Sequence, residues 1–246
     1  RCTMGGLEQN RFFCRFADDR RRFPENAAHR GRHYANSKNA PGGRAIGTTE
    51  HVVSHESADV RERSERHLRA LASLLELRFP HTAGRQRRVC DIAALIGRAL
   101  RLSPESMDAL SVAAQFHDIG MLAISDSLIM LATPFVRQHR DILRLHTDAG
   151  GRMVATLLPE LPEAAEAIWW HHERPDRGGP YGLHRDEIPV LASIIALADA
   201  IEAMAHFRPH RPARTPNEIF AEVERNKGLQ FEPDLVVLWY DFGDLQ

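Results

Sequence analysis

From about residue 59 to the C-terminus, apolar residues recur every three or four positions, which is the spacing of one face of an α-helix. A half-buried strand would instead alternate apolar and polar side chains, and no convincing stretch of that kind occurs. The sequence therefore predicts an all-α fold, a compact helical bundle. The clearest helical runs are Leu68, Leu71 and Leu75, and then Val89, Ile92, Ala93, Ile96 and Leu100.

Local signals predict where several helices begin and end. Ser103, Pro104 and Glu105 form a typical start, because they supply a capping hydroxyl, a proline in the first turn and an acid near the positive helix end. The helix that follows should lead into His117. Thr147–Gly151 is expected to form a flexible turn. Further helices are predicted at about 135–146, 152–158, 162–172, 188–206 and 216–226.

Two parts of different character divide the chain. Residues 1–58 are polar and irregular, with the basic run Arg20–Arg22 and the turn formers Pro41–Gly43, so we expect a disordered or loosely ordered leader there. We expect the basic run to be solvated and not a binding patch. Residues 59–246 should form the folded domain.

Composition narrows the choice of partner and compartment. A net charge of −1 gives no reason to expect a nucleic acid polymer or an anionic membrane as partner, and no apolar run is long enough to span a bilayer. The three cysteines, Cys2, Cys14 and Cys90, are too few and too scattered for a disulfide framework or a zinc ribbon. We therefore expect a cytoplasmic protein.

Residues that carry chemistry gather in one short segment, His171–Leu183, whose sequence is HHERPDRGGPYGL. Imidazoles bind transition metals, arginine binds phosphate, and glycines let the backbone approach a ligand closely. This combination predicts a metal-assisted phosphate site and a metal-dependent phosphohydrolase.

Two acidic positions extend the candidate site. His117 follows Met107 and Leu110 at helical spacing and so points toward the core, and Asp118 beside it offers a carboxylate that can bridge two metals. Asp199 interrupts an apolar helix and needs a partner if it is buried and ionised. That partner is either a metal ion or one of the many arginines, and the sequence leaves both open.

Three further histidines lie in or after helices. His146 follows Ile142 by one turn beside the expected flexible turn, so taken alone it is expected to lie on the surface. His171 and His172 should emerge at the end of a buried helix. Side chains from facing helices can converge on one site, so wide separation in the sequence does not exclude a shared metal.

Taken together, these elements resemble one known family. From about residue 75 to the end, the chain is similar to the HD-GYP family, a branch of the HD-domain metal-dependent phosphohydrolases. Several motifs matching in order make the resemblance specific. They are Pro80–Val89, His117–Gly120, His171–Leu183, Asp199, Arg208–Arg211 and Gln230–Pro233.

The resemblance implies a set of metal ligands and a cofactor. His117, Asp118 and Asp199 would hold one metal, and Asp118, as the catalytic carboxylate, would bridge to a second ion also held by His146 and His171. Two divalent ions, iron or manganese, would share an activated water that attacks phosphorus.

The resemblance also implies a substrate, since members typically hydrolyse cyclic di-GMP. The expected partner is a cyclic dinucleotide or another phosphoester, with a homodimer or a signalling protein as further candidates. Arg208 and Arg211 would grip the phosphates, whereas Arg174 and Asp176 would brace the loop or contact the nucleotide. The residues implied in substrate binding are Arg174, Asp176, Gly179, Pro180, Arg208 and Arg211.

Position 85 departs from the family pattern. The family's first metal-binding histidine falls where this chain has Arg85, and a guanidinium cannot ligate a metal. His81 lies four residues earlier and would partly compensate if this segment is helical. His81 and His172 both correspond to ligands of a third metal in some members.

Two smaller departures leave the function open. Met121 replaces a lysine, and the chain keeps Gly179 and Pro180 without the tyrosine between them, Tyr181 lying just beyond. One hypothesis is a metal-dependent phosphodiesterase that hydrolyses cyclic di-GMP or a related phosphoester. The other is a catalytically degenerate sensor or interaction module. A nucleotide phosphohydrolase of the wider HD group is a third alternative.

Overall fold

The computed structural model describes residues 49–126, 137–207 and 212–243. The chain divides into two compact units, residues 1–60 and 61–246. Within the described residues the regular elements are helical, and the only bridge outside them joins Lys227 to Phe231. The predicted all-α fold class is therefore confirmed.

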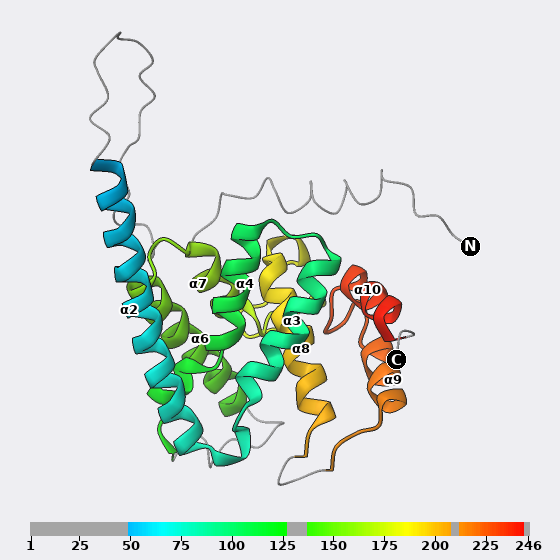
Figure 1. Cartoon of the computed structure of the whole chain (residues 1–246). Coiled ribbons are helices and arrows are strands. Elements are labelled where there is room, and N and C mark those ends of the chain that lie inside the picture. Colours follow the sequence, from blue (N-terminus) through cyan, green and yellow to red (C-terminus); the bar gives the residue numbers. More distant parts are fainter. Residues whose placement is uncertain (1–48, 127–136, 208–211, 244–246) are drawn as a thin grey trace. The chain divides into compact units, whose positions relative to one another are not determined.

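Eleven described helices, three of them short 3-10 helices, form the sequence of elements shown in Figure 1. Helix α2 crosses the division between the units, and its part from Arg61 onward belongs to the second unit. The elements are α2 (Thr49–Arg78), η1 (Pro80–Thr82), α3 (Arg85–Ala99), α4 (Pro104–Phe116), η2 (Ile119–Ala123), α6 (Arg137–Leu157), α7 (Pro162–Trp170), η3 (Arg185–Glu187), α8 (Val190–Ala205), α9 (Pro216–Arg225) and α10 (Pro233–Gly243).

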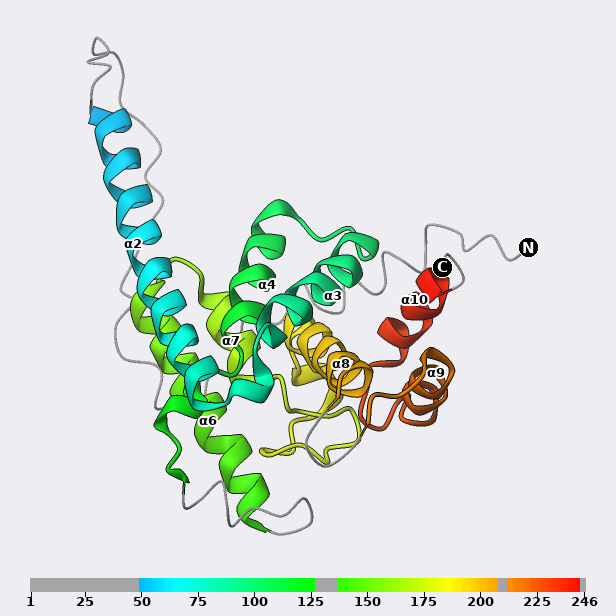
Figure 2. The same cartoon turned by 60° about the horizontal axis from the view of Figure 1, so that its bottom comes forward.

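Helix α8 forms the centre of the packing. It contacts α3, α4 and α7 on one side and α9 and α10 on the other (Figure 2). Its sequence is apolar almost all round, and a helix of this kind must be buried on most faces. Ile194, Ile195 and Leu197 are fully buried. Asp199 is therefore carried by an interior helix.

Several helix starts follow the local signals. Ser103 caps α4 by accepting a hydrogen bond from the Ser106 amide, with Pro104 at the first helical position, so this predicted start is confirmed. Thr215 and Glu218 form a capping box that begins α9. Helices near the predicted 162–172, 188–206 and 216–226 are confirmed as α7, α8 and α9. Helix α10 was not predicted.

Helix α6 corrects one expectation, since it runs unbroken from Arg137 to Leu157 and no turn separates residues 146 and 152. Its two glycines serve close packing and do not end the helix. A Cβ at Gly151 would lie 2.6 Å from the Trp169 ring. A Cβ on Gly120 of η2 would lie 1.9 Å from the carbonyl oxygen of His146 and 2.5 Å from the amide nitrogen of Gly150. Glycine therefore lets η2 and α7 touch α6 directly.

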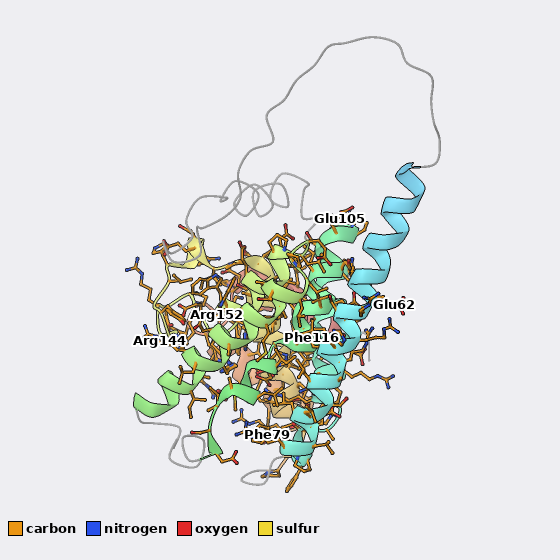
Figure 3. All side chains as sticks on the ribbon, turned by 90° about the vertical axis from the view of Figure 1, so that its left-hand side faces the viewer. Glu62, Phe79, Glu105, Phe116, Arg144 and Arg152 are labelled. Atoms are coloured by element: carbon orange, nitrogen blue, oxygen red, sulfur yellow. The ribbon has the colours of Figure 1, made fainter. Side chains whose placement is uncertain are left out.

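The outer side of α6 is charged and the interior is apolar. Figure 3 shows Arg144 and Arg152 along α6, where both side chains are exposed, whereas Phe116 at the end of α4 is buried. Among the described residues no helix combines the length and the apolar character that a bilayer span requires.

Candidate functional site

Four elements bring the predicted metal ligands to one place in the interior. Helix α4 ends at Phe116, so His117 and Asp118 lie in the turn between α4 and η2. The other candidates come from α6, from the end of α7 and from α8; α7 packs against both α6 and α8, and α6 packs against η2. The residues brought together are His117, Asp118, His146, His171, His172 and Asp199.

Three imidazole rings are held in the same way by the backbone of their own helices. The distances from Nδ1 to a carbonyl oxygen are 2.8 Å for His117 and Ala114, 3.0 Å for His146 and Ile142, and 2.8 Å for His171 and Ile168. A carbonyl oxygen only accepts, so Nδ1 carries the hydrogen in each ring. In a neutral ring this leaves a lone pair on Nε2, which is the arrangement of a metal-binding histidine.

His146, His171 and His172 form a cluster, which we call the histidine cluster. One ligand atom from each lies within 4.8 Å of the others. The Nε2 atoms of His146 and His171 are buried, and within the described part of the chain neither has a hydrogen-bond partner. Buried polar atoms without a partner are costly and rare, so the cluster is suited to a cation.

The position of His146 corrects the expectation of a surface histidine. It lies inside α6 and is 2% exposed. The expectation was wrong because Gly150 and Gly151 continue the helix and turn this face of α6 toward η2 and α7.

Asp118 divides its two carboxylate oxygens between different neighbours. Oδ2 lies 3.2 Å from Nε2 of His117 and accepts a 2.7 Å hydrogen bond from Nη1 of Arg85. Oδ1 lies 3.8 Å from Nε2 of His146. Asp118 therefore connects the histidine cluster to a second group of charges.

Arg85 is the centre of that second group. Its Nη2 forms a hydrogen bond and ion pair with Oδ1 of Asp199, and its Nε lies 3.5 Å from Oε2 of Glu202. Of the two partners that the sequence left open for Asp199, the structure supplies an arginine. Burial alone would lower the pKa of Arg85, but Asp199 and Asp118 outweigh it and raise the pKa. The guanidinium is therefore a permanent buried cation.

Burial and charge push the histidine pKa values in opposite directions. Burial, together with the neighbouring His117 and His146, lowers the pKa of His171 to about 3, and burial also lowers the pKa of His146. Burial likewise opposes protonation of His117, but the carboxylates of Asp118 and Asp199 outweigh it and raise its pKa to about 10. The histidine cluster is thus neutral at pH 7, whereas His117 is protonated and pairs with Asp118 and Asp199.

A loop after His172 is held by two carboxylates. The amides of Tyr181 and Leu183 donate hydrogen bonds of 2.7 and 2.8 Å to the buried Glu173. Arg174 and Asp176 form a bidentate pair with distances of 2.9 and 2.7 Å, which braces the loop. Glu173 therefore sets the path of the loop.

The remaining residues predicted for the site either lie in this loop or have side chains outside the described residues. Gly179 and Pro180 lie in this loop and are buried. A Cβ on Gly179 would lie 2.7 Å from the Cα of Glu173, so glycine is required there. His81 lies in η1, but its side chain is outside the described residues. Arg208 and Arg211 also lie outside them.

Sequence reasoning missed two carboxylates. Glu173 lies between His172 and the loop, and an acid directly after two candidate metal ligands could have been predicted as a site residue. Glu202 is 2% exposed and lies one turn after Asp199 on the apolar helix α8. It accepts hydrogen bonds of 3.0 and 2.7 Å from Arg88. A second acid on a buried helix face was the signal for Glu202.

Comparison with known proteins gives a family and several relatives. Residues 69–235 match the family described as HD domain. RpfG, a cyclic di-GMP phosphodiesterase response regulator of Xanthomonas campestris, is 30% identical over 180 residues, which are 72% of this chain and 48% of that protein. A cyclic di-GMP phosphodiesterase of Thermotoga maritima is 32% identical over 171 residues, which are 69% of this chain and 46% of that protein.

Vibrio cholerae provides several further matches. The 3'3'-cGAMP-specific phosphodiesterase 2 is 30% identical over 188 residues, which are 76% of this chain and 36% of that protein. The crystal structure of the cyclic GMP-AMP specific phosphodiesterase V-cGAP3 matches with a TM-score of 0.59 at 18% identity, covering 72% of this chain and 48% of that chain. The chain thus spans about half or less of the length of these relatives.

Proposed function

The chain belongs to the HD domain family, and on this premise we propose that it is a metal-dependent phosphodiesterase that hydrolyses a cyclic dinucleotide. The matched relatives described as phosphodiesterases for cyclic di-GMP or 3'3'-cGAMP support this substrate class. The observation that carries the proposal is the histidine cluster, in which two buried Nε2 atoms lack partners among the described residues.

The residues of the cluster fit a divalent cation. The Nδ1 hydrogen bonds of His146 and His171 orient their lone pairs, and Asp118 adds a carboxylate oxygen 3.8 Å from His146. A set of nitrogen and oxygen ligands without cysteine is compatible with iron or manganese. When bound, such an ion would supply a Lewis acid that polarises the phosphoester and makes a strong nucleophile available at neutral pH.

The loop that follows the cluster would orient the substrate. Glu173 fixes the loop backbone through two amides, and the pair of Arg174 with Asp176 keeps the loop in one conformation. A fixed loop lowers the entropy lost when a nucleotide binds. Contacts of Arg208 and Arg211 with the phosphates stay a prediction, as does a metal contact of His81.

Hydrolysis assays with His171→Ala test the proposal. The purified full chain, supplied with Mn²⁺, should convert cyclic di-GMP or 3'3'-cGAMP to a linear dinucleotide or to mononucleotides, measured by liquid chromatography. His171→Ala should reduce the rate by at least about 100-fold, because it removes a metal ligand. His184→Ala is the matched control, since His184 is exposed and should leave the rate unchanged. Equal rates in wild type and His171→Ala would refute the proposed site.

Arg85 favours a second candidate function, a receptor that binds the cyclic dinucleotide without cleaving it. Its guanidinium is bonded to both Asp118 and Asp199, the acids expected to hold one of two metals. Calorimetric binding of cyclic di-GMP with no product formed would favour the receptor. Hydrolysis of mononucleotides alone would favour a nucleotide phosphohydrolase.

The cysteines indicate the compartment in which the chain works. Cys90 is a free thiol, and the scattered cysteines suit a reducing compartment, so we propose the cytoplasm. A second copy of the chain or a signalling protein stays a predicted partner.

A further inference from the structure

Arg85 occupies one side of the candidate site with a charge that belongs to the protein. The oxygens of Asp118 and Asp199 that lie nearest to Nε2 of His117, at 3.2 and 3.5 Å, are the two oxygens that pair with the guanidinium. A metal ion held by these three residues would need those same oxygens. The guanidinium and a metal ion therefore compete for this side.

Arg85 is not easily displaced from this position. Its side chain is 15% exposed and is surrounded by Asp118, Asp199 and Glu202. Glu202 is held in turn by Arg88, with a 2.7 Å ion pair. A guanidinium stays protonated and cannot ligate a metal, so a dication beside it would meet repulsion and gain no ligand.

The opposite side of the site is formed by the histidine cluster. Oδ1 of Asp118, the oxygen that faces His146, is not one of the oxygens paired with Arg85. The ligand atoms of His146, His171 and His172 lie within 4.8 Å of one another. This side offers three nitrogens to a single ion, with Oδ1 of Asp118 3.8 Å from Nε2 of His146, and nitrogen and oxygen ligands suit borderline metals.

We propose that Arg85 replaces one of the two metal ions, so that the chain binds a single divalent cation on the histidine cluster with Oδ1 of Asp118. This inference rests on the proposed metal site, and it proposes one ion where the family resemblance implies two. The fixed guanidinium would neutralise Asp118 and Asp199 in place of the missing ion.

Metal content of the purified full chain tests the number of ions. After incubation with Mn²⁺ and removal of the free ion, plasma mass spectrometry should give one equivalent per chain. Electron paramagnetic resonance of the same sample should show the spectrum of isolated Mn²⁺, whereas two neighbouring ions would give an exchange-coupled spectrum. Two equivalents, or none, in the wild type would overturn the inference, and this measurement needs no variant to fold.

Variants locate the ion and test the role of Arg85. Arg85→His removes the guanidinium and adds a ligand, so its content should rise to two equivalents with a coupled spectrum. Arg87→His is the matched control, because Arg87 is exposed two residues further along α3, and it should keep one equivalent. His146→Ala should lose the ion. An unchanged content in either Arg85→His or His146→Ala would contradict the proposal.

The measurements distinguish failure of the single-ion inference from failure of the proposed activity. One bound ion without hydrolysis would refute the phosphodiesterase and leave the single-ion site standing. Hydrolysis by a chain that holds two ions would support the phosphodiesterase and refute the role of Arg85.

Discussion

Replacing Arg85 by methionine should lower the free energy of unfolding by about 3–5 kcal/mol at pH 7 in the presence of a chelator. The side chain is 15% exposed and pairs with Asp118 and Asp199, which are 13% and 15% exposed. Its removal leaves two largely buried carboxylates with only the His117 imidazolium beside them, and breaking a buried ion pair from one side has this cost. Methionine fills similar space with a flexible apolar chain, so the loss of packing should be small.

Urea unfolding followed by circular dichroism measures this loss. With a slope of roughly 2 kcal/mol per molar urea, the midpoint should fall by about 1.5–2.5 M. Arg87→Met is the matched control on the same helix, and its exposed side chain should change stability by less than about 0.5 kcal/mol. A loss below about 1 kcal/mol for Arg85→Met would show that the guanidinium does not neutralise the two acids.

Four other outcomes follow from the same contacts. Glu173→Gln should destabilise by about 1–3 kcal/mol in urea titrations, because it leaves a partly buried loop amide without an acceptor. Gly120→Ala should cost about 3 kcal/mol or more and weaken Mn²⁺ binding, since its Cβ would meet the His146 carbonyl at 1.9 Å. Arg174 lowers the pKa of Asp176 from 3.8, so the pair stabilises the fold above that pH and its contribution disappears as the pH falls; Asp176→Asn should flatten this acid-side decline. A chelator should lower the melting temperature of the metal-loaded chain, whereas an unchanged melting temperature would contradict metal binding to the native state.

Arg85 also separates the two functional candidates. The Arg85 guanidinium is present without any metal having to bind. Unlike a metal ion, however, it cannot take a water molecule or a phosphate oxygen as a ligand. If hydrolysis is found, the histidine cluster and Asp118 must hold the metal ion that supports it. If binding occurs without hydrolysis, the guanidinium is the structural reason, because it occupies the oxygens of Asp118 and Asp199.

Local patterns in the sequence determined most of the helical architecture. The apolar spacing predicted α7, α8 and α9, and Ser103 with Pro104 predicted the start of α4, because helix propensity and capping act within a few residues. Gly150 and Gly151 misled the same reasoning. Their use is close packing against Gly120 and Trp169, and that depends on residues far away in the sequence.

The sequence by itself supplied the chemistry of the site: its imidazoles, its acids and the unusual arginine at position 85. Tertiary structure alone decided how they are paired. The packing of α3 against α8 brings Arg85 to Asp199, and the packing of α6 against α7 and η2 brings His146 to His171 and Asp118. Ion pairs and ligand sets depend on distances of a few ångströms between distant segments, and no local pattern specifies those distances.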